Sequence, residues 1–365
     1  MSGSNENEPT DRRRFLGGSV LAAGSVALAA LSACSRESAD PVAAAGAAEG
    51  PPAAAPPAGP PPRDQVLGTP LPAGQRQQPQ LKDLKGKTVY ITGGNTGIGL
   101  GIGRAAANAG MNVVMGYIQD DQVEPAMATY APEQRERVIA IRHDVTDRDG
   151  WVKTLAEINA TFGNLHLLVN NAGIKTLRQA SQVDARAWDA AVAVNFTGIY
   201  NGCAAVIPHM LQHGEGAHIV TTASMGGILP GVNAGVYTAT KFAAFGIMEA
   251  LRVELMGTNI GTSVYSPGGV STDHEPDDPA RVAMMDPVEA GERVLNGVVN
   301  NDLFIFTHPE FKAGMKERFD AILASGPDEP FPEARATAET RVLTAPPYKP
   351  EIEHRSRKRS SYRSV

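Results

Sequence analysis

Short apolar runs alternate with longer stretches of helical periodicity between residues 84 and 323. This alternation predicts an α/β fold in which a parallel sheet carries helices on both faces, with ligands bound at the carboxyl ends of the strands. We expect one doubly wound, seven-stranded parallel sheet in a single domain over residues 81–310. The predicted strands lie at 88–93, 112–116, 138–143, 165–170, 218–222, 261–266 and 302–307, and the helices around 98–109, 147–161, 186–213, 233–256 and 287–299.

Composition changes sharply on both sides of this domain. Residues 34–80 are dominated by Ala, Pro, Gly and Gln, which bury too little apolar surface to offset the entropy of ordering, so we predict a disordered linker. Residues 311–365 are predicted to form a carboxyl-terminal extension ending in a basic tail. The net charge of -6 gives no electrostatic reason to bind nucleic acid, and with only Cys34 and Cys203 no disulfide framework is expected.

Residues 1–33 have the pattern of an export signal. Arg12, Arg13 and Arg14 precede an apolar stretch, which resembles the twin-arginine signal of bacteria, and "LSAC" at 31–34 resembles a lipoprotein processing site. We therefore expect an exported protein of the periplasm or cell envelope, anchored to the membrane through a lipid on Cys34. An uncleaved membrane anchor is the alternative, because the apolar stretch could just span a bilayer.

A glycine-rich segment follows the first predicted strand. Gly93, Gly97 and Gly99 stand in a G-x-x-x-G-x-G spacing between an apolar β-rich run and an Ala-rich helix. Glycine allows positive φ and close backbone approach, while a helix amino terminus offers free N–H groups to a pyrophosphate. An ordinary glycine-rich turn is the alternative. The strand–loop–helix context favours a dinucleotide-binding loop of the Rossmann type.

Seven motifs occur in the order typical of one enzyme family. They are "TGGNTGIG" (92–99), "HDVTD" (143–147), "NNAG" (170–173), "VNFTG" (194–198), Ser224, "YTATK" (237–241) and "SPGGVST" (266–272). Residues 84–310 thus resemble the short-chain dehydrogenase/reductase family, which implies an NAD(P)-dependent oxidoreductase. The resemblance implies that Asp144 contacts the adenine amine, Val145 its ring edge and Thr272 the nicotinamide amide. Asn170 would shape the cofactor cleft, although it could equally stabilise the sheet. The full predicted cofactor set is Gly93, Asn95, Thr96, Gly97, Ile98, Gly99, Tyr117, Asp144, Val145, Asn171, Ala172, Gly173, Tyr237, Lys241, Pro267, Gly268, Val270 and Thr272.

The choice between NAD and NADP stays open. An acidic residue after the second strand would bind a free ribose 2′-hydroxyl, and a basic one would pair with a 2′-phosphate. Tyr117 and Ile118 occupy these positions, and Thr96 replaces the basic residue that often precedes the second loop glycine. None of the three is diagnostic.

Four residues form the predicted catalytic set: Asn195, Ser224, Tyr237 and Lys241. Tyr237 and Lys241 are four residues apart on a predicted helix and therefore share one face. Tyrosine is a poor base at neutral pH, but a neighbouring ammonium and a positive nicotinamide favour its phenolate, so it could exchange a proton with an alcohol or ketone. Lys241 would also hold the ribose hydroxyls, Ser224 would bind the substrate oxygen, and Asn195 would hold a water linked to Lys241, unless its role is purely structural.

Other conspicuous residues have simpler interpretations. Cys203 is expected in the core rather than as a nucleophile, and His209 and His213 have helical metal-ligand spacing but no evident third ligand. No metal site is therefore predicted. The acidic segment 274–278 is interpreted as loop charge, with contact to a substrate as the alternative.

The carboxyl-terminal segment 302–330 and "GIGLGIG" at 97–103 resemble the family subset that oxidises bulky secondary alcohols, including aryl alcohols of the lignin-degradation type. We therefore expect a small-molecule alcohol or ketone substrate that is bulky or aromatic. Two alternatives remain: a non-catalytic nucleotide-binding or sensing protein, and a sugar-nucleotide epimerase or dehydratase. A homodimer or homotetramer is expected through helices 186–213 and 233–256.

Overall fold

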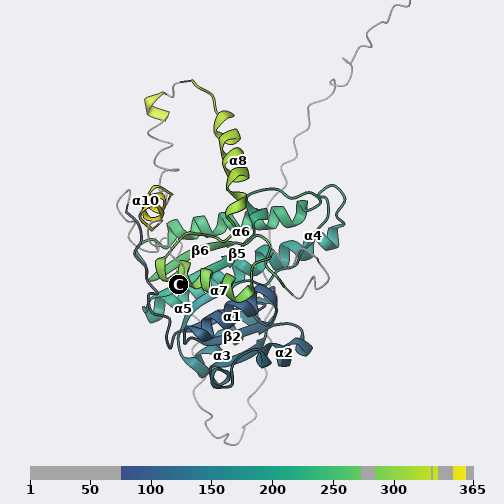
Figure 1. Cartoon of the computed structure of the whole chain (residues 1–365), viewed down its shortest axis with the longest axis vertical. Coiled ribbons are helices and arrows are strands. Elements are labelled where there is room, and N and C mark those ends of the chain that lie inside the picture. Colours follow the sequence, from purple (N-terminus) through teal and green to yellow (C-terminus); the bar gives the residue numbers. More distant parts are fainter. Residues whose placement is uncertain (1–74, 273–283, 330–331, 336–347, 359–365) are drawn as a thin grey trace, which may run out of the picture. The chain divides into compact units, whose positions relative to one another are not determined.

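In the part of the chain that the structure describes, seven parallel strands form one sheet in the order β3-β2-β1-β4-β5-β6-β7. Figure 1 shows this sheet among its helices, with β2, β5 and β6 labelled. The computed structural model describes residues 75–272, 284–329, 332–335 and 348–358. Most strand positions are fully buried because both faces of the sheet are covered, as the apolar runs require. The predicted seven-stranded, doubly wound fold is confirmed. The strands are β1 Thr88–Ile91, β2 Asn112–Tyr117, β3 Val138–Arg142, β4 Leu165–Asn170, β5 Ala217–Thr222, β6 Ile260–Ser266 and β7 Phe304–Phe306.

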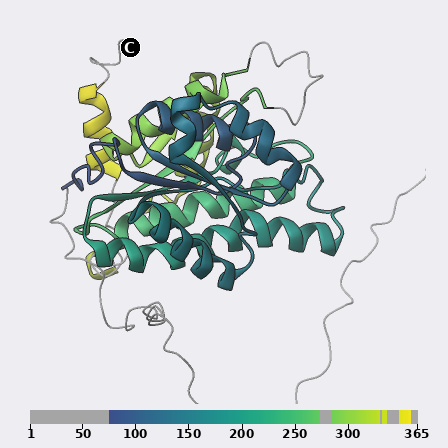
Figure 2. The same cartoon turned by 90° about the horizontal axis from the view of Figure 1, so that it is seen from below.

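Helices cover the sheet in two layers (Figure 2). Helices α1 and α7 pack on one face, and α3, α5 and α6 pack on the other. Gly101 lets α1 and α7 approach closely, since a Cβ there would lie 2.1 Å from the carbonyl oxygen of Pro287. The helices are α1 Gly97–Asn108, α2 Val123–Ala128, α3 Arg148–Phe162, α4 Ala185–Val192, α5 Gly198–His213, α6 Gly235–Glu254, α7 Pro287–Asn300, α8 Lys312–Ala324 and α10 Tyr348–Lys358, with short turns η1 Asp120–Gln122, η2 Pro132–Arg137, η3 Ala193–Thr197, η4 Met225–Gly227 and η6 Pro309–Phe311.

The helix predicted over residues 186–213 is observed as α4 and α5 joined by the π-helical turn η3. This element, Ala185–His213, is long and apolar enough to cross a membrane by composition. Its buried residues Ile199, Val206 and Met210 instead belong to the core beneath the sheet. The short helix α2 was not predicted, because its six residues are too few to show a period.

Residues 75–80, assigned to the linker from composition, pack along the edge of the sheet where the strands begin. Gln77 is 4% exposed, and its Nε2 lies 3.1 Å from Leu255 O, 3.2 Å from Thr258 O and 2.9 Å from Ile260 O. Residues 75–80 therefore pack with the domain, although their composition assigned them to the linker. The predicted export signal, Cys34, residues 34–74 of the linker, the acidic segment 274–278 and the end of the basic tail lie outside the described residues.

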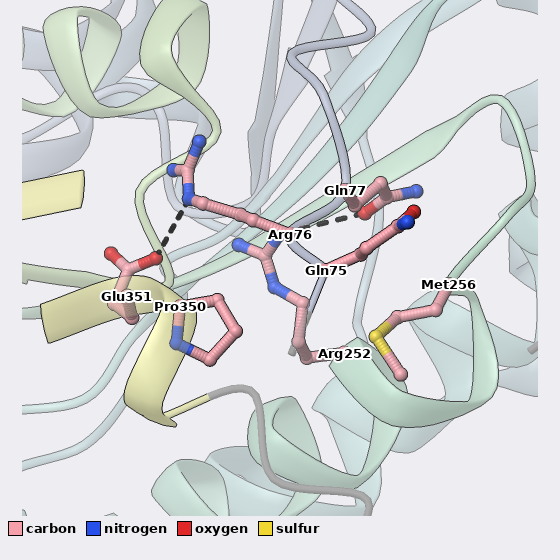
Figure 3. A pocket seen from close by; sticks show the side chains of 7 residues that line it. All are labelled: Gln75, Arg76, Gln77, Arg252, Met256, Pro350 and Glu351. Atoms are coloured by element: carbon pink, nitrogen blue, oxygen red, sulfur yellow. Dashed lines mark hydrogen bonds and ion pairs between the residues drawn. The ribbon is translucent and has the colours of Figure 1, made fainter. Parts of the chain in front are cut away.

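Ion pairs tie this amino-terminal segment to α10, in an arrangement we call the clasp: Arg76, Asp302, Glu351 and Arg355. Figure 3 shows one of these pairs, between Arg76 and Glu351. Arg76 Nε lies 3.1 Å from Glu351 Oε2, and Arg355 Nη2 lies 3.4 Å from an oxygen of the buried Asp302. The cavity beside the clasp holds about 10 Å³, the space of one water molecule, so it is no ligand site. Within the predicted extension, α10 is thus fastened to the domain.

Candidate active site

The glycine-rich loop between β1 and α1 has the backbone that a phosphate-binding loop requires. Gly93 and Gly97 have φ angles of 60° and 51°, a region that favours glycine. At Gly99 a Cβ would lie 2.1 Å from the carbonyl oxygen of Gly93, so a side chain there would force the loop apart. All three glycines predicted from spacing are therefore needed by the observed geometry.

The amino terminus of α1 is free of side-chain caps. Thr96 occupies the N-cap position without a capping hydrogen bond, and the first turn contains no acidic residue. The uncapped N–H groups and the positive end of the helix dipole can therefore bind an anion, with half-buried Ile98 between the loop glycines. Asn95 has a different task, since its Nδ2 donates to Gln122 Oε1 over 3.1 Å and holds the loop against η1.

Thr92 joins this loop to the segment that follows β4. Its Oγ1 accepts hydrogen bonds from the N–H groups of Asn171 and Ala172, over 2.9 and 3.0 Å. Asn171 Nδ2 in turn donates to the carbonyl oxygen of Gly93 over 3.2 Å. The cofactor residues predicted on two separate loops are thus brought together. Thr92 was absent from the prediction, because its partners are backbone groups of a distant segment.

The predicted adenine side lies at the ends of β2 and β3. The His143 N–H donates to the carbonyl oxygen of Tyr117 over 2.9 Å, which brings Tyr117 beside Asp144 and Val145. Asp144 is exposed, and its Oδ1 accepts from the N–H and hydroxyl of Thr146 over 2.9 and 2.8 Å. Val145 is 7% exposed. Asp144 is thus a fixed carboxylate next to a buried apolar side chain, and its contact with adenine stays a prediction.

Tyr237 and Lys241 face the same side of α6, as their spacing predicts. Lys241 is 6% exposed, and its Nζ lies 5.5 Å from the centre of the Tyr237 ring. The same Nζ donates to the carbonyl oxygen of Thr222 over 2.9 Å. Burial lowers the pKa of Lys241 to about 8, because the interior disfavours its charged form. The site thus holds a buried ammonium beside the phenol ring of Tyr237.

Ser224 lies on the loop after β5, near the Tyr237 side chain. Its Oγ accepts from the Gly226 N–H over 3.0 Å. A Cβ at Gly226 would lie 3.3 Å from Tyr237 Cε1 and 3.5 Å from Ser224 Oγ. The Ser224 and Tyr237 side chains therefore both lie close to Gly226, which has no side chain.

Asn195 lies in the π turn η3 with its side chain already engaged. Its Oδ1 accepts from the Ile174 N–H over 2.8 Å, and its Nδ2 donates to Ile174 O over 2.9 Å and to Thr240 Oγ1 over 3.2 Å. These bonds leave the amide no free N–H group, so a side-chain donor for the expected water is not available. The contacts support the structural alternative, in which Asn195 shapes the wall formed by Gly173, whose Cβ would lie 3.7 Å from Lys241 Nζ.

The loop after β6 carries the four remaining predicted cofactor residues. The Met225 N–H donates to Pro267 O over 2.9 Å, so this loop contacts the segment next to Ser224. Val270 pairs with Met285 in an isolated bridge. The other two predicted cofactor residues of this loop are Gly268, whose N–H donates to His308 Nδ1 over 2.9 Å, and half-buried Thr272.

Cys203 is buried in the core, and burial raises the pKa of its thiol to about 12. A protonated thiol in this position is no nucleophile. Asn170 Nδ2 lies 3.5 Å from Cys203 Sγ and 3.4 Å from Thr221 Oγ1, contacts that support its structural interpretation.

His209 and His213 use their rings to bind backbone. His209 Nε2 accepts from the Leu165 N–H over 3.3 Å, and His213 Nδ1 accepts from the Glu215 N–H over 3.0 Å. Among the described residues, no group of three or more His, Cys, Asp or Glu could hold a metal ion.

Comparison with known proteins identifies the family. Residues 87–282 match the family described as short chain dehydrogenase, which is more than half of the chain. The chain belongs to this family, and it is an NAD(P)-dependent oxidoreductase on that basis.

Two relatives and one solved structure extend the comparison. A C alpha-dehydrogenase of Sphingobium sp. is 29% identical over 282 residues, covering 69% of this chain and 91% of the relative. A 3-alpha-(or 20-beta)-hydroxysteroid dehydrogenase of Mycobacterium bovis is 33% identical over 218 residues, covering 58% and 82%. The structure of a short chain dehydrogenase/reductase of Burkholderia phymatum in complex with NAD has a TM-score of 0.61 and 26% identity, covering 68% of this chain and 99% of that chain.

Proposed function

We propose that this protein interconverts a secondary alcohol and a ketone, with Tyr237 as the general acid and base. The observation that carries this proposal is the position of the buried Lys241 Nζ, 5.5 Å from the centre of the Tyr237 ring, in a site whose other wall holds Ser224. In that position the ammonium would stabilise negative charge that develops on the phenol oxygen during proton transfer.

The loops described above fit a dinucleotide. Gly93, Gly97 and the uncapped amino terminus of α1 suit a pyrophosphate, and a Cβ at Gly99 would destroy the cradle. Tyr117 and the 61% exposed Ile118 present no charge to a ribose 2′-position, so no preference between NAD and NADP follows. When bound, the nicotinamide supplies or accepts the hydride.

The protein's own part in the reaction is to position the substrate and to move one proton. Ser224 Oγ would hold the substrate oxygen while the Tyr237 hydroxyl oxygen takes its proton during oxidation and returns it during reduction. Lys241 would keep its ammonium beside the Tyr237 ring and is itself fixed by Thr222 O. Asn195 positions the Ile174 segment that closes this side of the site.

We propose further that the substrate is bulky and apolar. Ile174, Leu177 and Val232 are 38%, 51% and 92% exposed on segments that adjoin the site. These segments contact each other, because the Gly235 N–H donates to Arg178 O over 3.0 Å. An apolar rim suits a ring-bearing alcohol, and the hydroxysteroid dehydrogenase relative is named for such a substrate.

Dinucleotide reduction at 340 nm tests both parts of this proposal. Purified protein would be assayed with NAD⁺ and NADP⁺ against a series of secondary alcohols, from 2-propanol to aryl and polycyclic alcohols. We expect kcat/KM to rise with the apolar size of the alcohol. Activity that does not depend on the size of the alcohol would contradict the substrate class. The reaction itself would be contradicted if no alcohol reduced NAD⁺ or NADP⁺ and no ketone oxidised NADH or NADPH.

We also propose that the protein is lipid-anchored in the cell envelope. Support comes from the sequence alone: the tandem arginines before an apolar stretch, followed by Cys34 in "LSAC".

Self-association through α4, α5 and α6 is proposed as well, since Trp188 on α4 and Tyr200 on α5 are 40% and 51% exposed. Sedimentation equilibrium of wild type and Tyr200→Lys would test it.

A further inference from the structure

His308 contacts two peptide groups of the loop after β6, one on each side of the Gly268–Gly269 pair. Its Nδ1 lies 2.9 Å from the Gly268 N, and its Nε2 lies 3.0 Å from the carbonyl oxygen of Gly269. The side chain is 9% exposed. One imidazole therefore bonds both a backbone donor and a backbone acceptor of the same loop.

These two bonds define the state of the ring. A backbone N–H can only donate, so Nδ1 must be an acceptor, and a carbonyl can only accept, so Nε2 must carry the proton. The neutral imidazole with its proton on Nε2 satisfies both partners. Thr307 Oγ1 lies 2.8 Å from Nδ1 and can donate to the same atom.

Strand register explains why these groups meet. Ser266 at the end of β6 pairs with Phe306 at the end of β7. Gly268 and His308, each two positions beyond the end of its strand, therefore lie at the same level. The ring then fits against bare backbone: a Cβ at Gly268 would lie 2.7 Å from His308 Cγ and 2.8 Å from Phe311 Cε2. Glycine at position 268 is thus required for the histidine to fit.

The loop that His308 holds reaches the reaction centre. On its other side, Pro267 O accepts the Met225 N–H beside Ser224, and further along Met285 bonds Gly269 O through its N–H over 3.1 Å. Any displacement of residues 267–270 would therefore be felt by Val270 and Thr272, which are expected to meet the nicotinamide. We propose that His308 is a positioning residue that fixes this loop for the nicotinamide end of the dinucleotide, an inference that rests on the proposed role of the loop.

Comparing two ligands isolates this role. Calorimetry would measure the binding of NAD⁺ or NADP⁺, whichever wild type binds more tightly, and of ADP-ribose or its 2′-phosphate, which lack nicotinamide. His308→Phe keeps a ring of similar size and removes both bonds. Since one hydrogen bond contributes a few-fold to tenfold, we expect about tenfold weaker dinucleotide binding. ADP-ribose binding should stay within about twofold, because its partners lie on other loops.

Two further variants guard against a trivial loss of structure. His308→Asn keeps an acceptor near the position of Nδ1 for the Gly268 N–H and should restore part of the affinity. Phe311→Leu reduces packing beside the ring without removing either bond, and should leave dinucleotide affinity near wild type. In turnover, His308→Phe should raise KM for the dinucleotide. The pH dependence of kcat should stay close to that of the wild type.

Each contrary result has a distinct meaning. Equal losses for both ligands, or unchanged dinucleotide affinity in a folded His308→Phe, would overturn the positioning role. Wild type that binds neither ligand would overturn the proposed dinucleotide site itself, and this inference with it.

Discussion

Lys241 Nζ donates a 2.9 Å hydrogen bond to the carbonyl oxygen of Thr222, the last residue of β5. The bond anchors the ammonium between the sheet and α6, out of contact with bulk water. The burial that results, which lowers the pKa of Lys241 to about 8, should be measurable as a dependence of stability on pH.

Between pH 8 and about 10.4 the unfolded chain holds a proton on Lys241 that the folded chain has largely lost. The unfolded state then binds more protons, so the free energy of unfolding contributed by this residue rises with pH, by up to about 1.4 kcal/mol per unit. Below pH 8 both states are charged and the contribution is constant. Urea unfolding of wild type and Lys241→Met at pH 7, 8.5 and 9.5 checks this. A stability difference between the two that does not change with pH would contradict it.

Tyr237→Phe removes the proposed proton carrier and leaves the ring in place. We expect turnover to fall by about 10²–10⁴-fold, the usual contribution of a general acid and base, with dinucleotide binding retained. Tyr200→Phe, on the exposed face of α5, is the matched control and should keep normal turnover. Near-normal turnover in Tyr237→Phe would end its assignment as acid and base.

Gly99→Ala should damage the dinucleotide loop directly. The new Cβ would lie 2.1 Å from Gly93 O and 2.6 Å from Asn171 Nδ2, so the loop must move apart. We expect at least about tenfold weaker dinucleotide binding, measured by calorimetry. Gly246→Ala, on α6 with no atom within 4 Å of the added Cβ, should bind normally. Equal affinities in both variants would show that this glycine is not needed at the site.

Asp302→Asn should destabilise the clasp without affecting the site. Asp302 is 1% exposed and pairs with Arg76 and Arg355, so the neutral variant removes a buried charge that both cations share and leaves them only Glu351 as an anionic partner. A loss of about 3 kcal/mol is expected in urea unfolding, with unchanged dinucleotide affinity. Asp320→Asn, in an exposed pair with Lys316, should cost less than about 1 kcal/mol. Similar losses in the two variants would mean that the clasp adds little.

Cys34→Ala should release the protein from the membrane if the cysteine carries the anchoring lipid. Mass spectrometry of the wild-type protein is expected to find a mature chain that begins at lipidated Cys34. A membrane-bound protein that keeps residues 1–33 would support the uncleaved anchor instead.

The hydrophobic pattern was sufficient to predict the sheet. Every predicted strand overlaps an observed one, because buried parallel strands are short apolar runs that a sequence displays directly. Tyr237, Lys241 and Ser224 were also predictable, since helical spacing and position after a strand determine where such side chains meet. Their catalytic roles stay predictions.

Contacts with backbone groups were harder to foresee. Thr92, His308 and Arg76 all bind peptide groups of remote segments, which have no signature in the sequence. His308 became recognisable only once the register of β6 and β7 placed it opposite Gly268. Likewise, the segment "VNFTG" has no pattern that predicts the π turn, in which Asn195 forms hydrogen bonds with Ile174.

The clasp also determines how the domain would respond to being held at its amino-terminal side. The chain enters the domain at Gln75, along the edge where the strands begin, whereas Ser224 and the glycine loop lie at the opposite edge, where strands end. A pull on the upstream chain would therefore load the ion pairs of Arg76 before it reached any strand. A moderate pulling force would then break these ion pairs before it deformed the sheet. An enzyme tethered from this side would therefore keep its catalytic geometry under such a force.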